Sequence, residues 1–226
     1  MSDLAQLENK NRHVALFDMD HTVLHVDSSM SWMRFLKRRG ELPRFYSARA
    51  AWWGMQYKLA LLDVDSLADR LVAKLRGDSE TEFADKVEEW HRTDGFKTVA
   101  PAAKSVIKRH QQRGDVVALL TGSNHYAAGV VARSLGIEHV LATRFEVVDG
   151  LFTGKVAERC FGNHKIGVAE SWAAQNALCL DSATFYSDSY QDLPMLSRVA
   201  QPVAVNPDIR LRRHARAKRW SVRSWR

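Results

Sequence analysis

The sequence predicts an α/β fold, with a doubly wound parallel sheet as its core and a helical domain inserted after the first strand. From about residue 96 onward, helical and strand-like segments alternate, which is typical of parallel strands joined by crossover helices. Between residues 27 and 95 no strand-like alternation interrupts the helical pattern. We therefore assign residues 1–26 and 96–226 to the core and residues 27–95 to a helical cap.

The first strand and the helices of the insertion have clear sequence signals. Residues 13–18 read His-Val-Ala-Leu-Phe-Asp, an apolar run that suits a buried strand. Each segment that follows begins with a capping Asp-Ser pair or a proline, or ends at a glycine, as helices commonly do. The helices expected in the insertion span residues 28–40, 42–63, 65–77 and 78–95.

The rest of the chain predicts the remaining strands and their crossover helices. Helices are expected over residues 100–114, 125–136, 164–178, 191–199 and 207–219. Strands are expected over residues 115–123, 138–142, 183–189 and 200–205. Asp149 and Gly150 stand between two β-prone arms, and an Asp-Gly pair favours a tight two-residue turn, so residues 144–156 predict a hairpin.

Composition and charge narrow the class of protein. The chain has 226 residues, 46% hydrophobic and 26% charged, as in a globular rather than a disordered protein. The net charge of +7 originates in residues 210–226, which contain seven Arg, one Lys and no acid and leave the remainder at −1. Nucleic acid is therefore an unexpected partner. The basic tail is interpreted as a solvated helix, with weak contact to an anionic membrane as the alternative.

Targeting signals and cysteine spacing indicate a cytoplasmic protein. The first residues lack the apolar segment of a secretory signal, and the longest apolar stretch, residues 50–62, is interrupted by Lys58. Cys160 and Cys179 show no metal-ligand spacing, which fits reduced thiols. The sequence does not indicate an oligomeric state.

Reactive side chains follow three of the predicted strands, and the carboxyl ends of parallel strands meet at one edge of a sheet. Clustered carboxylates suit Mg²⁺, whereas a hydroxyl, a glycine amide and an ammonium group suit phosphoryl oxygens. Two aspartates can also divide the work of nucleophile and acid–base catalyst. The residues expected at this edge are Asp18, Asp20, Thr121, Gly122, Ser123, Lys165, Asp188 and Asp192.

These residues form four ordered motifs that resemble those of haloacid dehalogenase-like phosphohydrolases. Residues 17–22, Phe-Asp-Met-Asp-His-Thr, resemble motif I, and residues 119–123, Leu-Leu-Thr-Gly-Ser, resemble motif II. Lys165 stands at the place of motif III, and residues 186–196 resemble motif IV. The insertion after motif I and the end of the chain resemble the phosphoserine phosphatase-like branch. The resemblance implies a Rossmann-like core, a helical cap and Mg²⁺-dependent phosphatase activity.

The resemblance also implies a role for each residue. Asp18 would be the nucleophile that becomes an aspartyl-phosphate, and Asp20 would protonate the leaving alcohol and then activate water. The other implied roles are phosphoryl binding by Thr121 and Gly122, charge neutralisation by Lys165, metal ligation by Asp18, Asp188 and the Asp20 carbonyl, and orientation of Lys165 or of a metal-bound water by Asp192.

Some positions depart from the family pattern or have two interpretations. Gln191 stands where the branch commonly has Asn, which leaves its phosphate- or water-binding role open. Ser187 replaces a common Gly and is expected to alter only the turn. Asp27 would either face a substrate amine or cap the helix that follows it. Helix packing is the favoured interpretation, with an apolar lid as the alternative, for Trp32, Trp52, Trp53 and Tyr57.

The expected function is hydrolysis of a small phosphorylated substrate of the phosphoserine or histidinol-phosphate kind. One alternative is a lipid-phosphate phosphatase, of the phosphatidylglycerophosphate kind, with the same fold. The other is a module without catalytic activity that binds anions through the basic tail.

Overall fold

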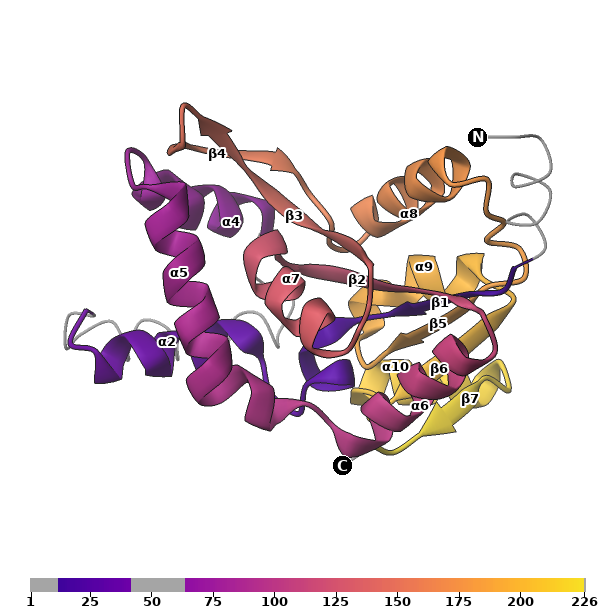
Figure 1. Ribbon diagram of the computed structural model, residues 1–226. Helices are drawn as coiled ribbons and strands as arrows, with labels where there is room; N and C mark the ends of the chain where they lie inside the picture. Colours follow the sequence, from indigo (N-terminus) through magenta and orange to yellow (C-terminus); the bar gives the residue numbers. More distant parts are fainter. Residues whose placement is uncertain (1–11, 42–63, 226) are drawn as a thin grey trace.

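The computed structural model describes residues 12–41 and 64–225, which contain a seven-stranded sheet (Figure 1). The strand order is β4-β3-β2-β1-β5-β6-β7, and all neighbours are parallel except β3 and β4, which are antiparallel. The strands are β1 Val14–Phe17, β2 Val116–Asn124, β3 His139–Val148, β4 Leu151–Glu158, β5 Thr184–Ser187, β6 Gln201–Val205 and β7 Ser221–Arg223. The predicted α/β class with a parallel core is confirmed.

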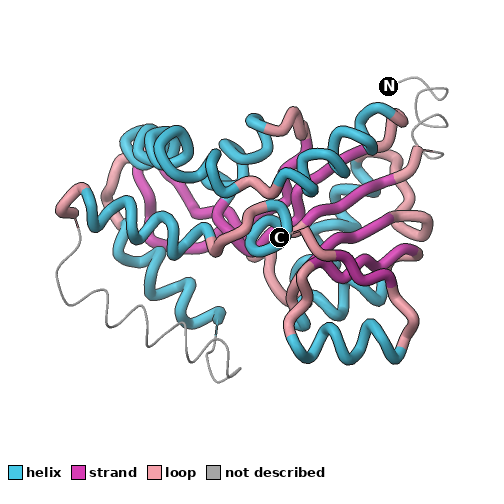
Figure 2. Tube along the Cα trace, turned by 90° about the horizontal axis from the view of Figure 1, so that it is seen from below, coloured by secondary structure: helices cyan, strands magenta, loops and turns pink. Residues whose placement is uncertain are grey.

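Helices cover both faces of the sheet, as a doubly wound fold requires (Figure 2). These helices are α6 Pro101–Gln112, α7 His125–Ser134, α8 His164–Gln175, α9 Leu193–Arg198 and α10 Ile209–Ala217. Successive side chains of β1 point to opposite faces. Ala15 and Phe17 belong to a buried cluster with residues of α6 and α7, whereas Val14 and Leu16 belong to a second cluster with residues of α8, α9 and α10.

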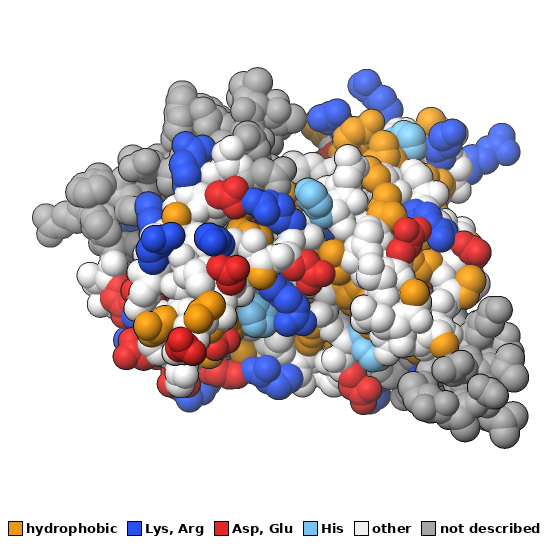
Figure 3. Space-filling model, turned by 90° about the horizontal axis from the view of Figure 1, so that it is seen from above, with side chains coloured by type: hydrophobic (Ala, Val, Ile, Leu, Met, Phe, Trp, Pro, Cys, Tyr) orange, Lys and Arg blue, Asp and Glu red, His pale blue; other side chains and the backbone are white. Residues whose placement is uncertain are grey.

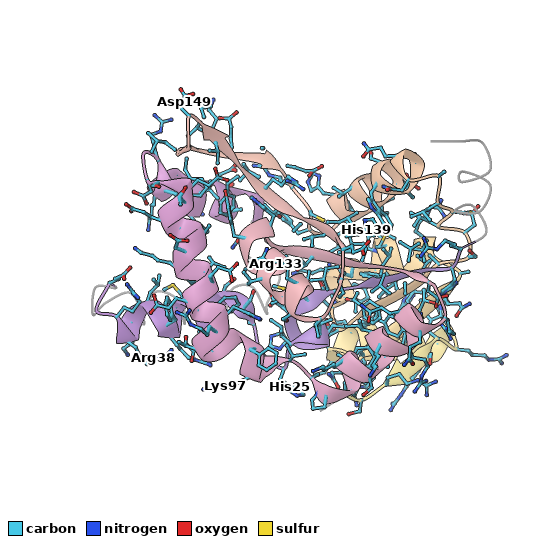
Figure 4. The ribbon with its side chains drawn as sticks, viewed as in Figure 1. His25, Arg38, Lys97, Arg133, His139 and Asp149 are labelled. Carbon is cyan, nitrogen blue, oxygen red and sulfur yellow. The ribbon has the colours of Figure 1, made fainter. Side chains whose placement is uncertain are left out.

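The predicted hairpin is present, and Asp149 lies at its tip (Figure 4). Asp149 and Gly150 have positive φ angles of 52° and 76°, the conformation that a two-residue hairpin turn favours. The prediction of a separate strand over residues 138–142 was wrong, because β3 continues without a break into the hairpin. The sequence also does not predict β7, whose three residues are too few to show a period.

The described part of the insertion is helical, as predicted. Its helices are α2 Ser28–Arg38, α4 Val64–Val72 and α5 Glu80–Trp90. The predictions for residues 42–63, including the packing of Trp52, Trp53 and Tyr57, lie outside the described residues. The boundaries of the cap at residues 27 and 95 stay a prediction.

Aromatic side chains connect the helices of the insertion with each other and with the core. Trp32 packs edge-on against Trp90, with 6.4 Å between ring centroids, which fits the helix-packing interpretation. Phe83 on α5 lies edge-on to Tyr126 on α7 at 5.2 Å, and the Tyr126 hydroxyl donates to Glu80 Oε1 at 2.7 Å. Helix α5 is therefore fixed to α7 of the core by apolar and polar contacts.

A buried polar cluster lies at the amino ends of β1 and β2. His13, His110 and Asp115 bring possible ligand atoms within 4.8 Å of one another. Both ring nitrogens of His110 already have partners, Asp115 at 2.7 Å and the Tyr186 hydroxyl at 2.9 Å, and Arg113 donates to Asp115. The two imidazole rings are also stacked nearly parallel, at 11°, so their lone pairs do not converge. We interpret this cluster as hydrogen-bonded packing.

Gly154 on β4 permits close contact between the hairpin and the turn after α4. Its φ is 80°, and a β-carbon there would lie 3.0 Å from Arg76 Cβ and 3.3 Å from Ala73 Cα. Gly150 has a similar φ but open space around it.

We expect Gly154→Ala to lower the free energy of unfolding by about 2–4 kcal/mol and Gly150→Ala by about 1–2 kcal/mol, because only the first adds a steric clash. Urea unfolding measures both losses, and equal losses would contradict the packing described here.

Candidate active site

Three neighbouring strands bring the site residues to one edge of the sheet. Asp18 directly follows β1, and its amide donates to the carbonyl of Tyr186 on β5 at 2.9 Å, so the backbone stays paired beyond the strand. Thr121 lies on β2 and Ser187 ends β5. Because β2, β1 and β5 are adjacent and parallel, these residues meet at the carboxyl ends of the strands.

At the centre of this edge, the ammonium group of Lys165 lies between two carboxylates. Its Nζ donates to Asp18 Oδ1 and to Asp192 Oδ2, both at 2.7 Å, and the Lys165 side chain is only 3% exposed. Burial opposes its charge, but Asp18 and Asp192 outweigh this effect and raise the pKa of Lys165 above its usual value. The Ser187 hydroxyl donates to the same Asp192 oxygen at 2.7 Å. Lys165 is therefore charged and held in one orientation.

The carboxyl groups around Lys165 outnumber its single ammonium group, and burial makes it costly to ionise all of them together. Burial raises the pKa of Asp18 to about 7 against the opposing effect of Lys165. Burial also raises the pKa of Asp188 to about 8, and the charges of Asp18 and Asp192 add to the increase. A second cation at this position would therefore be stabilised by the site.

Asp20 is oriented by two serines from different parts of the chain. Its Oδ1 accepts from the backbone amide of Ser28 at 2.8 Å, and its Oδ2 accepts from the hydroxyls of Ser28 at 3.0 Å and Ser123 at 2.8 Å. Burial raises the pKa of Asp20 to about 6, and the nearby charge of Asp27 adds to the increase. Ser28 is the first residue of α2 and Ser123 lies on β2, so Asp20 connects the insertion to the core.

Thr121 and Gly122 form the wall of the site on β2. Thr121 is 1% exposed, and its hydroxyl oxygen accepts from the amide of Ser123 at 3.2 Å. A β-carbon on Gly122 would lie 3.0 Å from Phe161 Cβ, so glycine permits close packing of the loop before α8. The Gly122 carbonyl accepts from the Thr143 hydroxyl at 2.9 Å, which fixes the peptide plane.

Two of the predicted substrate contacts lie toward the rim. Asp27 caps α2, because its Oδ1 accepts from the amide of Met30 at 2.8 Å. The capping interpretation of Asp27 is therefore supported, and its contact with a substrate amine stays a prediction. Gln191 is exposed, and its backbone amide donates to the Ser189 hydroxyl at 3.2 Å. Its phosphate- or water-binding role also stays a prediction.

Serine hydroxyls contribute contacts that sequence reasoning missed. The expectation that Ser187 alters only the turn was wrong, since its hydroxyl bonds to Asp192. Ser28 was interpreted only as the start of a helix, although it donates twice to Asp20. Proximity to the motifs gave a hint for Ser123 and Ser187. The contact of Ser28 depends on how α2 packs against the core, and no local pattern contains that information.

The comparison with known families agrees with this geometry. Residues 15–197 match the family described as haloacid dehalogenase-like hydrolase, which is most of the chain. The chain belongs to this family. Within it, the chain is a phosphatase of the phosphoserine phosphatase-like branch, as the ordered motifs predicted.

Two curated relatives of this hydrolase are named as phosphatases. A histidinol-phosphatase of Neisseria meningitidis is 30% identical over 93% of this chain and 98% of its own length. The phosphoserine phosphatase SerB1 of Mycobacterium tuberculosis is 33% identical over 94% of this chain and 70% of its own length. A solved structure of a phosphoserine phosphatase with an analogue of the phospho-aspartyl intermediate covers 96% of this chain and 95% of its own, with a TM-score of 0.69 and 21% identity. That similarity shows a shared fold.

Among the described residues of this hydrolase, no helix combines the length and the apolar character that crossing a bilayer requires.

Replacing Lys165 tests the buried charge cluster without an activity assay. Lys165→Met leaves Asp18 and Asp192 buried without their cation, so we expect the free energy of unfolding in EDTA to fall by about 3–5 kcal/mol. Lys155→Met is the control, because Lys155 is 69% exposed, and should have little effect. The double variant Lys165→Met, Asp192→Asn should lose about 1–3 kcal/mol less free energy of unfolding than the sum of the losses in the two single variants. Additive losses in urea unfolding would contradict the proposed coupling.

Proposed function

We propose that the protein is a Mg²⁺-dependent phosphomonoesterase that works through an aspartyl-phosphate on Asp18. The contact between Lys165 Nζ and Asp18 Oδ1 at 2.7 Å carries this proposal. An ammonium at this distance favours the ionised form of a carboxylate that burial would otherwise protonate. An ionised carboxylate with restricted access to water is suited to nucleophilic attack on a phosphoryl group.

A divalent cation fits the donor set of the site. The carboxylates of Asp18 and Asp188 and the backbone carbonyl of Asp20 are hard oxygen ligands of the kind that Mg²⁺ takes. Asp18 and Asp188 also repel each other in a buried setting, and a cation relieves that repulsion. We assign these three groups as the metal ligands. When bound, Mg²⁺ would offset the negative charge of the phosphoryl oxygens.

Two steps complete the reaction. In the first, a carboxylate oxygen of Asp18 attacks phosphorus, the bond from phosphorus to the substrate oxygen breaks, and Asp20 donates a proton to the departing alcohol. In the second, Asp20 takes a proton from water, the water oxygen attacks phosphorus, and the bond from phosphorus to Asp18 breaks. Thr121, the Gly122 amide and Lys165 would hold the phosphoryl oxygens in both steps.

Asp192 acts in this scheme as a positioning residue. It accepts hydrogen bonds from Lys165 and Ser187 through the same oxygen, Oδ2. Its charge holds the ammonium in place while Asp18 loses its own charge by becoming phosphorylated. Without Asp192, Lys165 would have one carboxylate partner in the free enzyme and none in the intermediate.

The proposed substrate is a small phosphate monoester that carries an amine. Histidinol and serine, which appear in the names of two relatives, are both amine-bearing alcohols. Asp27 lies close enough to Asp20 to affect its pKa, and it caps α2 through only one of its oxygens. We propose that the other carboxyl oxygen of Asp27 faces the ammonium group of the substrate.

Removal of the metal or of the nucleophile tests the proposed chemistry. Turnover of an aryl phosphate should stop in EDTA and return with Mg²⁺. Asp18→Asn should remove turnover, because the amide is nearly isosteric but is a far weaker nucleophile and metal ligand. Residual turnover of this variant near the wild-type rate would exclude Asp18 as the nucleophile.

Leaving-group dependence tests the role of Asp20 and of the serine that orients it. Asp20→Asn should reduce kcat/KM about 10²-fold or more for alkyl phosphates, whose poor leaving groups require a proton, and much less for aryl phosphates. Ser123→Ala should shift kcat in the same direction but less, because Ser28 still holds Asp20. Ser29→Ala, on an exposed neighbour, is the control. An equal loss for both ester classes would argue against general-acid catalysis by Asp20.

Asp27→Asn separates substrate recognition from helix capping. Asn caps a helix about as well as Asp, so stability should change little. If Asp27 holds the amine, KM for phosphoserine or histidinol phosphate should rise about tenfold or more, while KM for an aryl phosphate stays constant. Steady-state kinetics on these esters measure the difference. A small, uniform change across them would leave Asp27 with the capping role alone.

A further inference from the structure

A group of basic side chains covers α10 and the edge strand β7. The members of this basic surface are all exposed, and they are Arg210, Arg212, Arg213, Arg216, Lys218, Arg219 and Arg223. Helix α10 packs on the sheet through Leu211 and Ala215, which are both fully buried. The opposite side of the helix therefore carries the exposed arginines. Strand β7 lies at the edge of the sheet, with a neighbouring strand on one side only.

In the described part of the chain, the charges of this basic surface have no acidic partners. None of the ion pairs found within residues 12–41 and 64–225 involves any of its seven members. Some arginines elsewhere do have acidic partners, as exposed Arg133 with Glu88 and half-buried Arg198 with Glu170 and Asp181 show. In Figure 3, basic and acidic side chains are interspersed on the left and lower parts of the face, whereas several basic side chains gather along its upper right edge. Concentrated, unpaired positive charge attracts an anionic partner.

Apolar side chains beside the arginines indicate which anionic partner fits. Ile209 is 83% exposed, more than any other large hydrophobic side chain in the described part of the chain, and Val222 is 40% exposed. Exposed aliphatic groups among arginines suit the boundary between lipid headgroups and acyl chains.

Nucleic acid fits the surface less well than lipid does. Single-stranded nucleic acid binds through aromatic rings that are free to stack on bases. The Tyr190 ring lies under the Arg210 guanidinium at 4.3 Å, and the Trp220 ring packs against His214 at 5.0 Å between centroids. Trp225 is buried. The rings nearest to the basic surface are thus occupied.

We propose that the basic surface binds the face of an anionic phospholipid bilayer, with Ile209 entering the headgroup layer. Binding would combine Coulomb attraction to the headgroups with burial of one aliphatic side chain, which together give reversible association. Helix α10 begins next to the active site, because the amide of Asp208 donates to the carbonyl of Asp188 at 2.9 Å. The bound protein would therefore keep its catalytic edge close to the bilayer.

Vesicle co-sedimentation of the full chain tests this proposal. We expect binding to phosphatidylcholine vesicles that contain about 30% phosphatidylglycerol in ~0.1 M salt, release in ~0.5 M salt, and no binding to phosphatidylcholine alone. The triple variant Arg212→Gln, Arg213→Gln, Arg216→Gln should weaken binding about tenfold or more. The matched control, Lys104→Gln, Lys108→Gln, Arg109→Gln on α6, removes the same charge elsewhere and should bind like the wild type.

A second variant separates the apolar contact from charge attraction. Ile209→Ser should weaken vesicle binding about threefold, because it removes the apolar contact and keeps every charge. Turnover of a soluble aryl phosphate and the urea unfolding midpoint should be unchanged in all variants, which shows that each is folded. Failure to bind anionic vesicles at low salt would overturn the proposal. Equal losses of vesicle binding in the two triple variants would also overturn it, as would binding of a single-stranded RNA without binding of vesicles. Vesicle co-sedimentation measures binding directly, so its result does not depend on the proposed catalytic function.

Discussion

The ammonium group of Lys165 lies between the carboxylates of Asp18 and Asp192, and the rest of the site is arranged around this contact. All three side chains are largely removed from water, so loss of any one of them would leave a buried charge without its partner. The arrangement requires β1, β5 and the start of α8 to meet at one point, which the parallel order of the sheet provides. Asp188 brings a further carboxyl group to the same place, and a cation bound there would relieve the cost of ionising these buried groups together.

The sheet and the catalytic edge could be predicted from the sequence because both depend on local patterns. A buried strand appears as an apolar run, and Asp18 and Asp20 stand out because they end such a run. The continuity of β3 through Thr143 was missed, since Thr143 is a polar residue that is buried through its hydrogen bond to Gly122. The contacts of Ser28 with Asp20 depend on the packing of α2 and leave no local signal.

The insertion and the core depend on each other through polar groups as well as through packing. Ser28 on α2 donates to Asp20, and Tyr126 on α7 donates to Glu80 on α5. A movement of α2 would therefore change the surroundings of the proposed acid–base residue. The hydrogen bond from the amide of Asp208 to the carbonyl of Asp188 joins the loop of this proposed metal ligand to the start of the basic helix α10. The insertion and helix α10 are thus both connected by hydrogen bonds to the same edge of the sheet.

The most direct test of the central claim is detection of the covalent intermediate on Asp18. Asp20→Asn should slow attack by water more than transfer from an aryl phosphate, so the phosphorylated enzyme should accumulate during turnover. Acid quenching, proteolysis and mass spectrometry should then find one phosphoryl group, on the peptide that contains Asp18. Turnover of the aryl phosphate with the phosphoryl group on another residue, or with none on Asp18 at any quench time, would contradict the account.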